Sequence, residues 1–204
     1  MYAYSHVTFS NVTNPTRYSS VLVVSATRAE AAHLRNGTRL VITGLGKATA
    51  AMALTAALTR SRHGIDPPVS TVVNIGTAGA LHDHHSGLFL PSRVTEHDLD
   101  AQTLAGLGYP TASSWDIADG DGTVLATGDS FINDSARRAE LAAIADLLDM
   151  EGAAFARVAA EFDVPLRLVK VVSDSADESA VDWPARIDAA AQLLADWFDD
   201  SGLG

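Results

Sequence analysis

Three carboxylates follow one strongly apolar segment near the C-terminal end of the chain. Residues 169–172 are Val-Lys-Val-Val, and Asp174, Asp177 and Glu178 come directly after them. A surface acid needs no apolar strand before it, whereas an α/β enzyme can deliver a proton donor to its active-site rim in this way. Taken alone, Asp174 has the simpler interpretation of a turn or cap acid. Two hypotheses follow, a solvated turn and an acid–base site.

Two further acids are ambiguous in the same way. Glu30 comes shortly after the apolar run 21–24, and Glu151 follows Asp149 and Met150 where a helix is predicted to begin. An acid near a helix N-terminus is favourable on electrostatic grounds alone, and Asp149 fits that interpretation as an N-cap or first-turn acid. The small residues after Glu151 would instead allow close packing around a pocket. Both interpretations of Glu151 remain open from its local sequence.

Glycine-rich and histidine-rich segments give weaker signals. Residues 44–47 (GLGK) open a predicted helix, but they complete neither of the glycine motifs that bind phosphates, so a tight strand-to-helix turn is favoured. Residues 82–85 (HDHH) have the side chains of metal ligands. However, adjacent residues of an extended loop point in alternate directions, and no second cluster completes a coordination sphere. We therefore predict a solvated loop there, with no metal and no other cofactor.

The elements that must position these residues alternate along the chain. Strands are predicted at residues 21–24, 39–43, 69–75, 124–127 and 166–172, and helical segments at 25–35, 48–62, 136–148, 151–161 and 188–198. This alternation predicts an α/β fold, a three-layer α/β/α sandwich with a central mixed, largely parallel sheet. Ligands of such folds bind at the carboxyl ends of the strands, where the acids and glycine-rich turns are found. We therefore expect a single site.

The composition fits one globular domain. Of the 204 residues, 47% are hydrophobic and 19% are charged, and we assign residues 1–20 to a polar N-terminal arm and residues 21–204 to one domain. The net charge of −11 argues against binding to a nucleic acid polymer or an anionic membrane, because clustered lysine and arginine bind phosphates. The sequence has no cysteine, no recognisable signal peptide and no apolar run of membrane-spanning length. We expect a cytoplasmic location.

Several segments together resemble the purine nucleoside phosphorylase/nucleosidase superfamily, and within it the 5′-methylthioadenosine/S-adenosylhomocysteine nucleosidases. They are SATRAEAAHL (25–34), GLGKATAA (44–51), VVNIGTAGAL (72–81), EHDLD (96–100), ATGDSFI (126–132) and DMEGAAFARVAAEFDVPLRLVKVVSDSAD (149–177). They occur in the family's order, and the pairing of DMEGAA with VVSDSAD is the most specific part. The resemblance implies a nucleoside phosphorylase-like fold and an enzyme that hydrolyses the N-glycosidic bond of a 5′-modified adenosine and releases adenine.

The resemblance also implies roles for the acids. Asp174 matches the general acid that acts on purine N7, and Glu30 matches the residue that orients or deprotonates the attacking water. Glu151 matches a glutamate that holds the ribose hydroxyls, and Met150 packs on the sugar. Carboxylates near the ring suit this reaction, because the sugar passes through a state with oxocarbenium character.

Other positions match residues that contact the substrate in the family. Phe131 matches the aromatic residue that stacks on the base, and Ile132 the residue whose backbone binds the adenine edge. Thr77 and Ser173 would supply hydroxyls near the sugar and the acid, and Trp183 matches an aromatic lid over the 5′ substituent. The segment around His97 resembles a loop that reaches a neighbouring subunit's pocket, which implies a homodimer.

Two alternatives remain open. A purine nucleoside phosphorylase is favoured by Arg28, although Asn74 stands where phosphorylases carry arginine and Glu30 would repel phosphate. A catalytically silent nucleoside-binding module is favoured by short segments at 30–44 and 109–122, and by Lys170, where these nucleosidases usually have arginine. Methylthioadenosine, adenosylhomocysteine, 5′-deoxyadenosine and a futalosine-like nucleoside all fit as the substrate.

Overall fold

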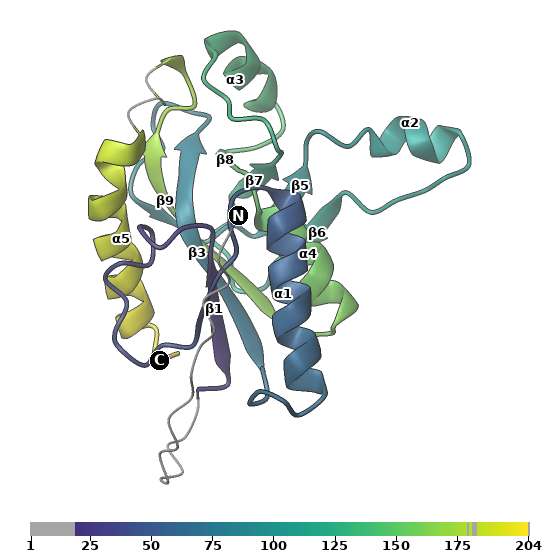
Figure 1. Ribbon diagram of the computed structural model, residues 1–204. Helices are drawn as coiled ribbons and strands as arrows, with labels where there is room; N and C mark the ends of the chain where they lie inside the picture. Colours follow the sequence, from purple (N-terminus) through teal and green to yellow (C-terminus); the bar gives the residue numbers. More distant parts are fainter. Residues whose placement is uncertain (1–18, 179, 181–182, 204) are drawn as a thin grey trace, which may run out of the picture.

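A mixed sheet forms the centre of the computed structural model, which describes residues 19–178, 180 and 183–203 (Figure 1). Most of the predicted N-terminal arm, residues 1–18, lies outside the described residues. The strands are β1 (Val21–Ser25), β2 (Leu40–Ile42), β3 (Thr71–Ala80), β4 (Leu88–Phe89), β5 (Arg93–Glu96), β6 (Ser114–Asp116), β7 (Val124–Thr127), β8 (Leu147–Asp149) and β9 (Leu166–Asp174). The helices are α1 (Lys47–Arg62), α2 (Ala101–Gly106), α3 (Ser135–Leu141), α4 (Gly152–Glu161) and α5 (Trp183–Asp200).

The sheet is largely parallel, as the alternation of elements predicted. Its order is β2-β1-β3-β8-β7-β5-β6, and β9 pairs with β3 and β4. The pairs β1–β2, β1–β3, β3–β9, β5–β7 and β7–β8 are parallel, and β3–β8, β4–β9 and β5–β6 are antiparallel. The carboxyl ends of the central parallel strands therefore meet at one edge of the sheet, where ligands of α/β folds bind.

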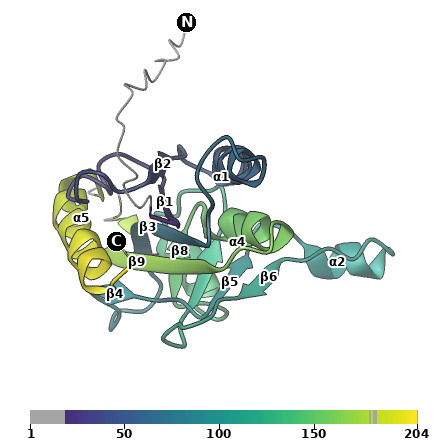
Figure 2. The same cartoon turned by 90° about the horizontal axis from the view of Figure 1, so that it is seen from below.

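Helices cover both faces of the sheet and give the predicted three layers (Figure 2). Successive residues of a strand point to opposite faces. In β1, Leu22 and Val24 pack with residues of α1 and α4, whereas Val21 and Val23 pack with residues of α5. The continuous apolar runs that predicted buried strands therefore reflect a sheet that is covered on both sides.

The prediction of helical structure at residues 25–35 is wrong, because this segment forms turns. Thr27 and Glu30 exchange hydrogen bonds as in a helix capping box: the Glu30 N–H donates to Thr27 Oγ1 over 3.2 Å, and the Thr27 N–H donates to Glu30 Oε2 over 3.1 Å. The other carboxylate oxygen of Glu30 accepts from Thr77 in β3, which ties the segment to the sheet.

The prediction of a helix at residues 136–148 is only partly correct. Helix α3 ends at Leu141, and residues 147–149 form strand β8 between β3 and β7. Leu147 and Leu148 are both buried, so two apolar residues that suited a helical pattern belong to the sheet. The short elements β5, β6 and α2 were not predicted.

Helix α2 and its flanking segments project from the body of the molecule (Figures 1 and 2). The Asp100 side chain caps this helix by accepting from the Thr103 N–H, and none of the helix residues is buried. Beyond the helix, Leu107 and Tyr109 are 67% and 73% exposed. In the described part of the chain, no helix has both the length and the apolar character needed to cross a membrane.

Candidate active site

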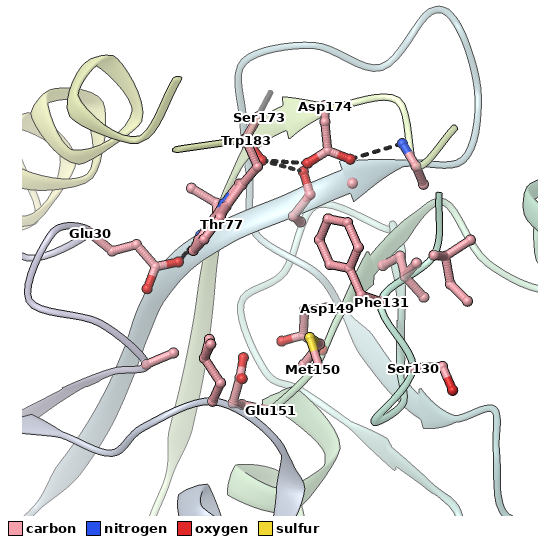
Figure 3. A pocket seen from close by; sticks show the side chains of 17 residues that line it. Glu30, Thr77, Ser130, Phe131, Asp149, Met150, Glu151, Ser173, Asp174 and Trp183 are labelled. Atoms are coloured by element: carbon pink, nitrogen blue, oxygen red, sulfur yellow. Dashed lines mark hydrogen bonds between the residues drawn. The ribbon is translucent and has the colours of Figure 1, made fainter. Parts of the chain in front are cut away.

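A cavity of about 110 Å³ lies at the carboxyl ends of the central strands. Nine of the ten site residues predicted from the sequence line this cavity. They are Glu30, Thr77, Phe131, Ile132, Met150, Glu151, Ser173, Asp174 and Trp183. Figure 3 shows the three acids on different sides of the cavity, with Glu30 beside Thr77, Glu151 at the start of α4, and Asp174 at the end of β9. Elements far apart in the sequence thus place three carboxylates around one space.

The Glu30 carboxylate is held by threonines on both of its oxygens. Oε1 accepts from the backbone N–H and the hydroxyl of Thr77 over 2.8 and 2.9 Å, and Oε2 accepts from the Thr27 hydroxyl over 2.9 Å. The residue is only 4% exposed. Because these donors come from two separate segments, the carboxylate has a fixed orientation at the cavity wall.

Asp174 is fixed by its own loop. Its Oδ2 accepts from the Ser173 hydroxyl over 2.8 Å, and its Oδ1 accepts from the Ala176 N–H over 2.9 Å. A Cβ atom at Gly79 in the neighbouring strand β3 would lie 3.0 Å from Asp174 Oδ1, so a glycine is needed for the acid to pack there. The buried position and both hydrogen bonds direct the carboxyl group at the cavity.

Glu151 joins the cavity to the glycine-rich turn before α1. Its Oε1 accepts from the Gly46 N–H over 2.7 Å. Gly44 and Gly46 both have positive φ, of 83° and 89°, so the predicted tight turn at residues 44–47 is confirmed. Burial, followed by the charge of Asp149, raises the pKa of Glu151 to about 7. Glu151 therefore changes its charge near neutral pH.

Aromatic and apolar side chains form the rest of the wall. Phe131 is 51% exposed and, with Met150 and Leu45, borders the cavity. The indole of Trp183 lies beside Thr77 and donates from Nε1 to its hydroxyl over 2.8 Å. A flat, partly apolar ligand could be held between such side chains and the acids.

His97 is the predicted site residue that does not line the cavity. Its ring packs on Gly128, where a Cβ atom would lie 2.3 Å from His97 Nε2. Within the described chain, neither ring nitrogen has a hydrogen-bond partner, and burial lowers the pKa of His97, which favours the neutral ring. His97 thus supports the strand end before Phe131 in its own chain. Its contact with a neighbouring subunit remains a prediction.

Asp149 belongs to the site although its sequence context predicted only a helix cap. That prediction is wrong in position, because Asp149 ends β8 and Glu151 is the N-cap of α4, although Asp149 Oδ2 does accept from the Gly152 N–H over 2.9 Å. It also lines the cavity and forms an ion pair of 2.8 Å with Lys170. Ser130 and Leu45 were missed as well. Their position beside Phe131 and in the glycine-rich turn was the available signal.

The positive side chains of the described residues do not reach the cavity lining. Arg28, which favoured a phosphorylase, is exposed. Asn74 is buried elsewhere and donates from Nδ2 to the Val24 carbonyl over 3.2 Å. The lining residues thus include four acids and no lysine or arginine.

The histidine-rich loop gives no metal centre. The expected alternation of side-chain direction is wrong, because the rings of His82, His84 and His85 contact one another at centroid distances of 4.2–5.6 Å. Among the residues that the structure describes, however, no group of three or more potential ligands has an arrangement that could hold a metal ion.

Comparisons with known proteins agree with this arrangement. Residues 28–198 match the model of the phosphorylase superfamily. The 5′-methylthioadenosine/S-adenosylhomocysteine nucleosidase of Bacillus subtilis is 30% identical over 183 residues, which cover 76% of this chain and 77% of that protein. Among solved structures, the nucleosidase of the same name from Helicobacter pylori has a TM-score of 0.74 at 20% identity and covers 88% of this chain and 96% of that one. The futalosine hydrolase of H. pylori has a TM-score of 0.72 at 20% identity, with coverage of 88% and 95%.

Proposed function

The chain belongs to the phosphorylase superfamily, and from this premise we propose that it hydrolyses the N-glycosidic bond of a 5′-modified adenosine and releases adenine. It is an N-glycosyl hydrolase, like the nucleosidases among its relatives. The observation that carries the proposal is the convergence of Glu30, Glu151 and Asp174 on one cavity. Residues 21–204 would form the catalytic domain, and the cytoplasmic location remains a prediction.

Asp174 and Phe131 would act on the purine. Cleavage leaves negative charge on the base, and a carboxylic acid at N7 can relieve that charge by donating a proton. Asp174 is buried and fixed by two hydrogen bonds, so it can present its carboxyl group without rearranging. The exposed ring of Phe131 would stack on the base, and the backbone of Ile132 would bind the adenine edge.

Glu30 and Glu151 would act on the sugar and the water. Positive charge develops on the ribose ring as the base leaves, and nearby carboxylates stabilise it. Glu30 would orient and deprotonate the attacking water, while Glu151 would accept hydrogen bonds from the ribose hydroxyls with Met150 packed on the ring. Thr77 and Ser173, which already bond to Glu30 and Asp174, would hold these acids in place.

Water is a better nucleophile for this cavity than phosphate. Inorganic phosphate needs cationic side chains, and the described lining has acids but no lysine or arginine. Arg28 is exposed and outside the lining, so it supplies no phosphate site in this chain. Hydrolysis is therefore favoured over phosphorolysis.

The 5′ substituent is the finer part of the proposal. Trp183 lies beside Thr77 and Glu30, where it would cover a group attached to the 5′ carbon. Methylthioadenosine and adenosylhomocysteine are the leading candidates because the curated relatives carry these substrates in their names. A futalosine-like nucleoside is the second candidate, since a futalosine hydrolase shares the fold.

A homodimer would complete the site. The projecting segment around α2 has no buried helix residue and exposes Leu107 and Tyr109, which suits packing against a second copy. The segment begins at His97, so its outward course would allow it to approach a neighbouring cavity.

The test is a product assay across methylthioadenosine, adenosylhomocysteine, 5′-deoxyadenosine and futalosine, with and without phosphate. In phosphate-free buffer we expect a free base and a free pentose from at least one of these nucleosides, the base being adenine from the three adenosines and hypoxanthine from futalosine. Strict dependence on phosphate, with a pentose-1-phosphate product, would identify a phosphorylase instead. Nucleoside binding without turnover would identify the catalytically silent module.

A further inference from the structure

A buried lysine lies behind the wall of the cavity. Lys170 projects from β9 and is 2% exposed, and its Nζ forms a 2.8 Å ion pair with Asp149 Oδ2. Lys170 is not among the residues that line the cavity, so its ammonium group faces the site only through the acids in front of it. A cation placed in this way can act on a substrate only through other side chains.

The neighbouring strand leaves space for this ammonium group. Gly76 in β3 is paired with Lys170, and a Cβ atom at Gly76 would lie 3.4 Å from Lys170 Nζ and 3.3 Å from Glu30 Oε1. A Cβ atom at this position would be tight against Glu30 and in contact with Lys170. The glycine thus allows a cation and a carboxylate to approach the same point in the interior.

Three acids on three elements act on the charge of Lys170. They are Asp149 at the end of β8, Glu151 at the start of α4 and Glu30 in the turns after β1. Burial alone would lower the pKa of Lys170, but these acids outweigh burial and raise it, so the lysine stays charged. In return, the lysine charge lowers the pKa of Glu151 against the upward effects of burial and Asp149.

We propose that Lys170 is a positioning residue that fixes Asp149 and keeps Glu151 available as a carboxylate for the ribose hydroxyls, without touching the substrate itself. The inference rests on the proposed function, since it assumes that Glu151 binds the ribose. A protonated Glu151 would lose an acceptor for one hydroxyl, whereas the ionised group can accept from both. Lys170 would thereby set the pH above which the substrate binds well.

The experiment compares Lys170→Met with Lys170→Arg, which retains the charge. KM and kcat for methylthioadenosine, or for whichever nucleoside the wild type cleaves, are measured from about pH 6 to pH 9. For Lys170→Met we expect the pH at which KM falls to move upward by one unit or more, which raises KM at pH 7 roughly fivefold or more. The kcat above that pH should change less. Lys170→Arg should restore the wild-type profile.

A second readout keeps the inference testable without turnover. The side-chain carboxyl ¹³C shift of Glu151, assigned with Glu151→Gln, reports its titration in the ligand-free protein. Lys170→Met should raise that midpoint. The double variant Lys170→Met/Asp149→Asn removes both buried charges and so avoids an unpaired Asp149. Its midpoint should return close to the wild-type value. The return is expected because Asp149 and Lys170 act on Glu151 in opposite directions.

The outcomes separate the inference from the proposed function. An unchanged Glu151 midpoint in Lys170→Met, or an unchanged KM profile in a variant that still turns over, would overturn the role of Lys170. If Lys170→Met does not fold, failure of Lys170→Arg to keep the wild-type midpoint would overturn it. A wild-type protein that releases no base from any nucleoside would instead refute the proposed function, and the ¹³C titration would still decide the effect of Lys170 on Glu151.

Discussion

The indole Nε1 of Trp183 donates a hydrogen bond of 2.8 Å to the Thr77 hydroxyl. The same hydroxyl donates to Glu30 Oε1 over 2.9 Å. One threonine therefore joins the aromatic side chain proposed to cover the 5′ group to the carboxylate proposed to activate water. A ligand that moves Trp183 would remove the donor to this hydroxyl and so weaken the hydrogen bond from Thr77 to Glu30.

Replacement of Thr77 by valine tests this connection. The variant keeps the backbone N–H that binds Glu30 but loses the hydroxyl, so Glu30 and Trp183 each lose one partner. We expect kcat to fall about tenfold, the effect of losing roughly one hydrogen bond in the transition state. Thr77→Ser keeps the hydroxyl and should stay near the wild-type rate. Equal activity of the valine variant would show that the connection does not affect catalysis.

Replacement of Gly79 by alanine should displace the general acid. The new Cβ atom would lie 3.0 Å from Asp174 Oδ1 and 3.0 Å from the Ala176 side chain, which is closer than these atoms can approach without movement. Because the neighbouring atoms would have to move by a few tenths of an ångström, we expect kcat to fall about tenfold, less than the roughly 100-fold loss of a full 1 Å displacement. Ile65→Ala is the control, since Ile65 is 63% exposed and lies outside both the cavity and the projecting segment. Full activity of Gly79→Ala would contradict the placement of Asp174.

The stability of the free protein should depend on pH through Glu151. Folding raises its pKa from 4.5 to about 7, so the folded protein holds a proton that the unfolded chain releases. The raised pKa of Glu151 therefore contributes to the free energy of unfolding. This contribution is fully present below the pKa of the unfolded chain and is lost as the pH rises through the pKa of the folded protein. Glu151→Gln cannot ionise, so its free energy of unfolding relative to wild type should increase between about pH 5 and pH 8, by up to about 3 kcal/mol.

Urea unfolding at the two pH values measures this difference. Glu161→Gln is the control, because Glu161 is exposed at the end of α4 and its substitution should give no such pH dependence. A difference between Glu151→Gln and wild type that is the same at both pH values would show that Glu151 ionises normally.

Replacement of Leu107 and Tyr109 by serine tests the proposed homodimer. Both side chains are exposed on the projecting segment, so their loss should leave the stability of the isolated chain nearly unchanged. We expect the mass measured by light scattering to fall from a dimer to a monomer, with a loss of activity. Ile65→Ser, at a position 63% exposed on another part of the surface, is the control. A wild-type protein that is monomeric would refute the homodimer.

The sequence predicted the parts of the fold whose apolar residues are buried. Strands β7 and β9 and helices α1 and α4 were placed correctly because their apolar residues are buried in the central core. Strand β6 was missed because Ser114 and Asp116 are exposed, which leaves no apolar alternation. Helix α2 was missed because none of its residues is buried. In both cases burial, the source of the sequence signal, is absent.

The sequence predicted which acids meet in the site, but it did not predict the ion pair or the pKa shift found there. The acids follow strands or open a helix, and the resemblance assigned them roles, so their convergence could be expected. The ion pair between Asp149 and Lys170 could not be expected from the sequence, because it joins two strands whose side-chain directions the sequence does not determine. The raised pKa of Glu151 depends on the same burial and neighbours, which exist only in the folded chain.

The most direct test of the central claim is the rate of adenine release by wild type and Asp174→Asn in phosphate-free buffer. The asparagine keeps the shape of the side chain but cannot donate a carboxylic proton, so kcat should fall by roughly two orders of magnitude or more. Asp177→Asn, three residues further along the chain, should keep its activity. Equal rates for wild type and Asp174→Asn would contradict the assignment of Asp174 as the acid on which this account rests.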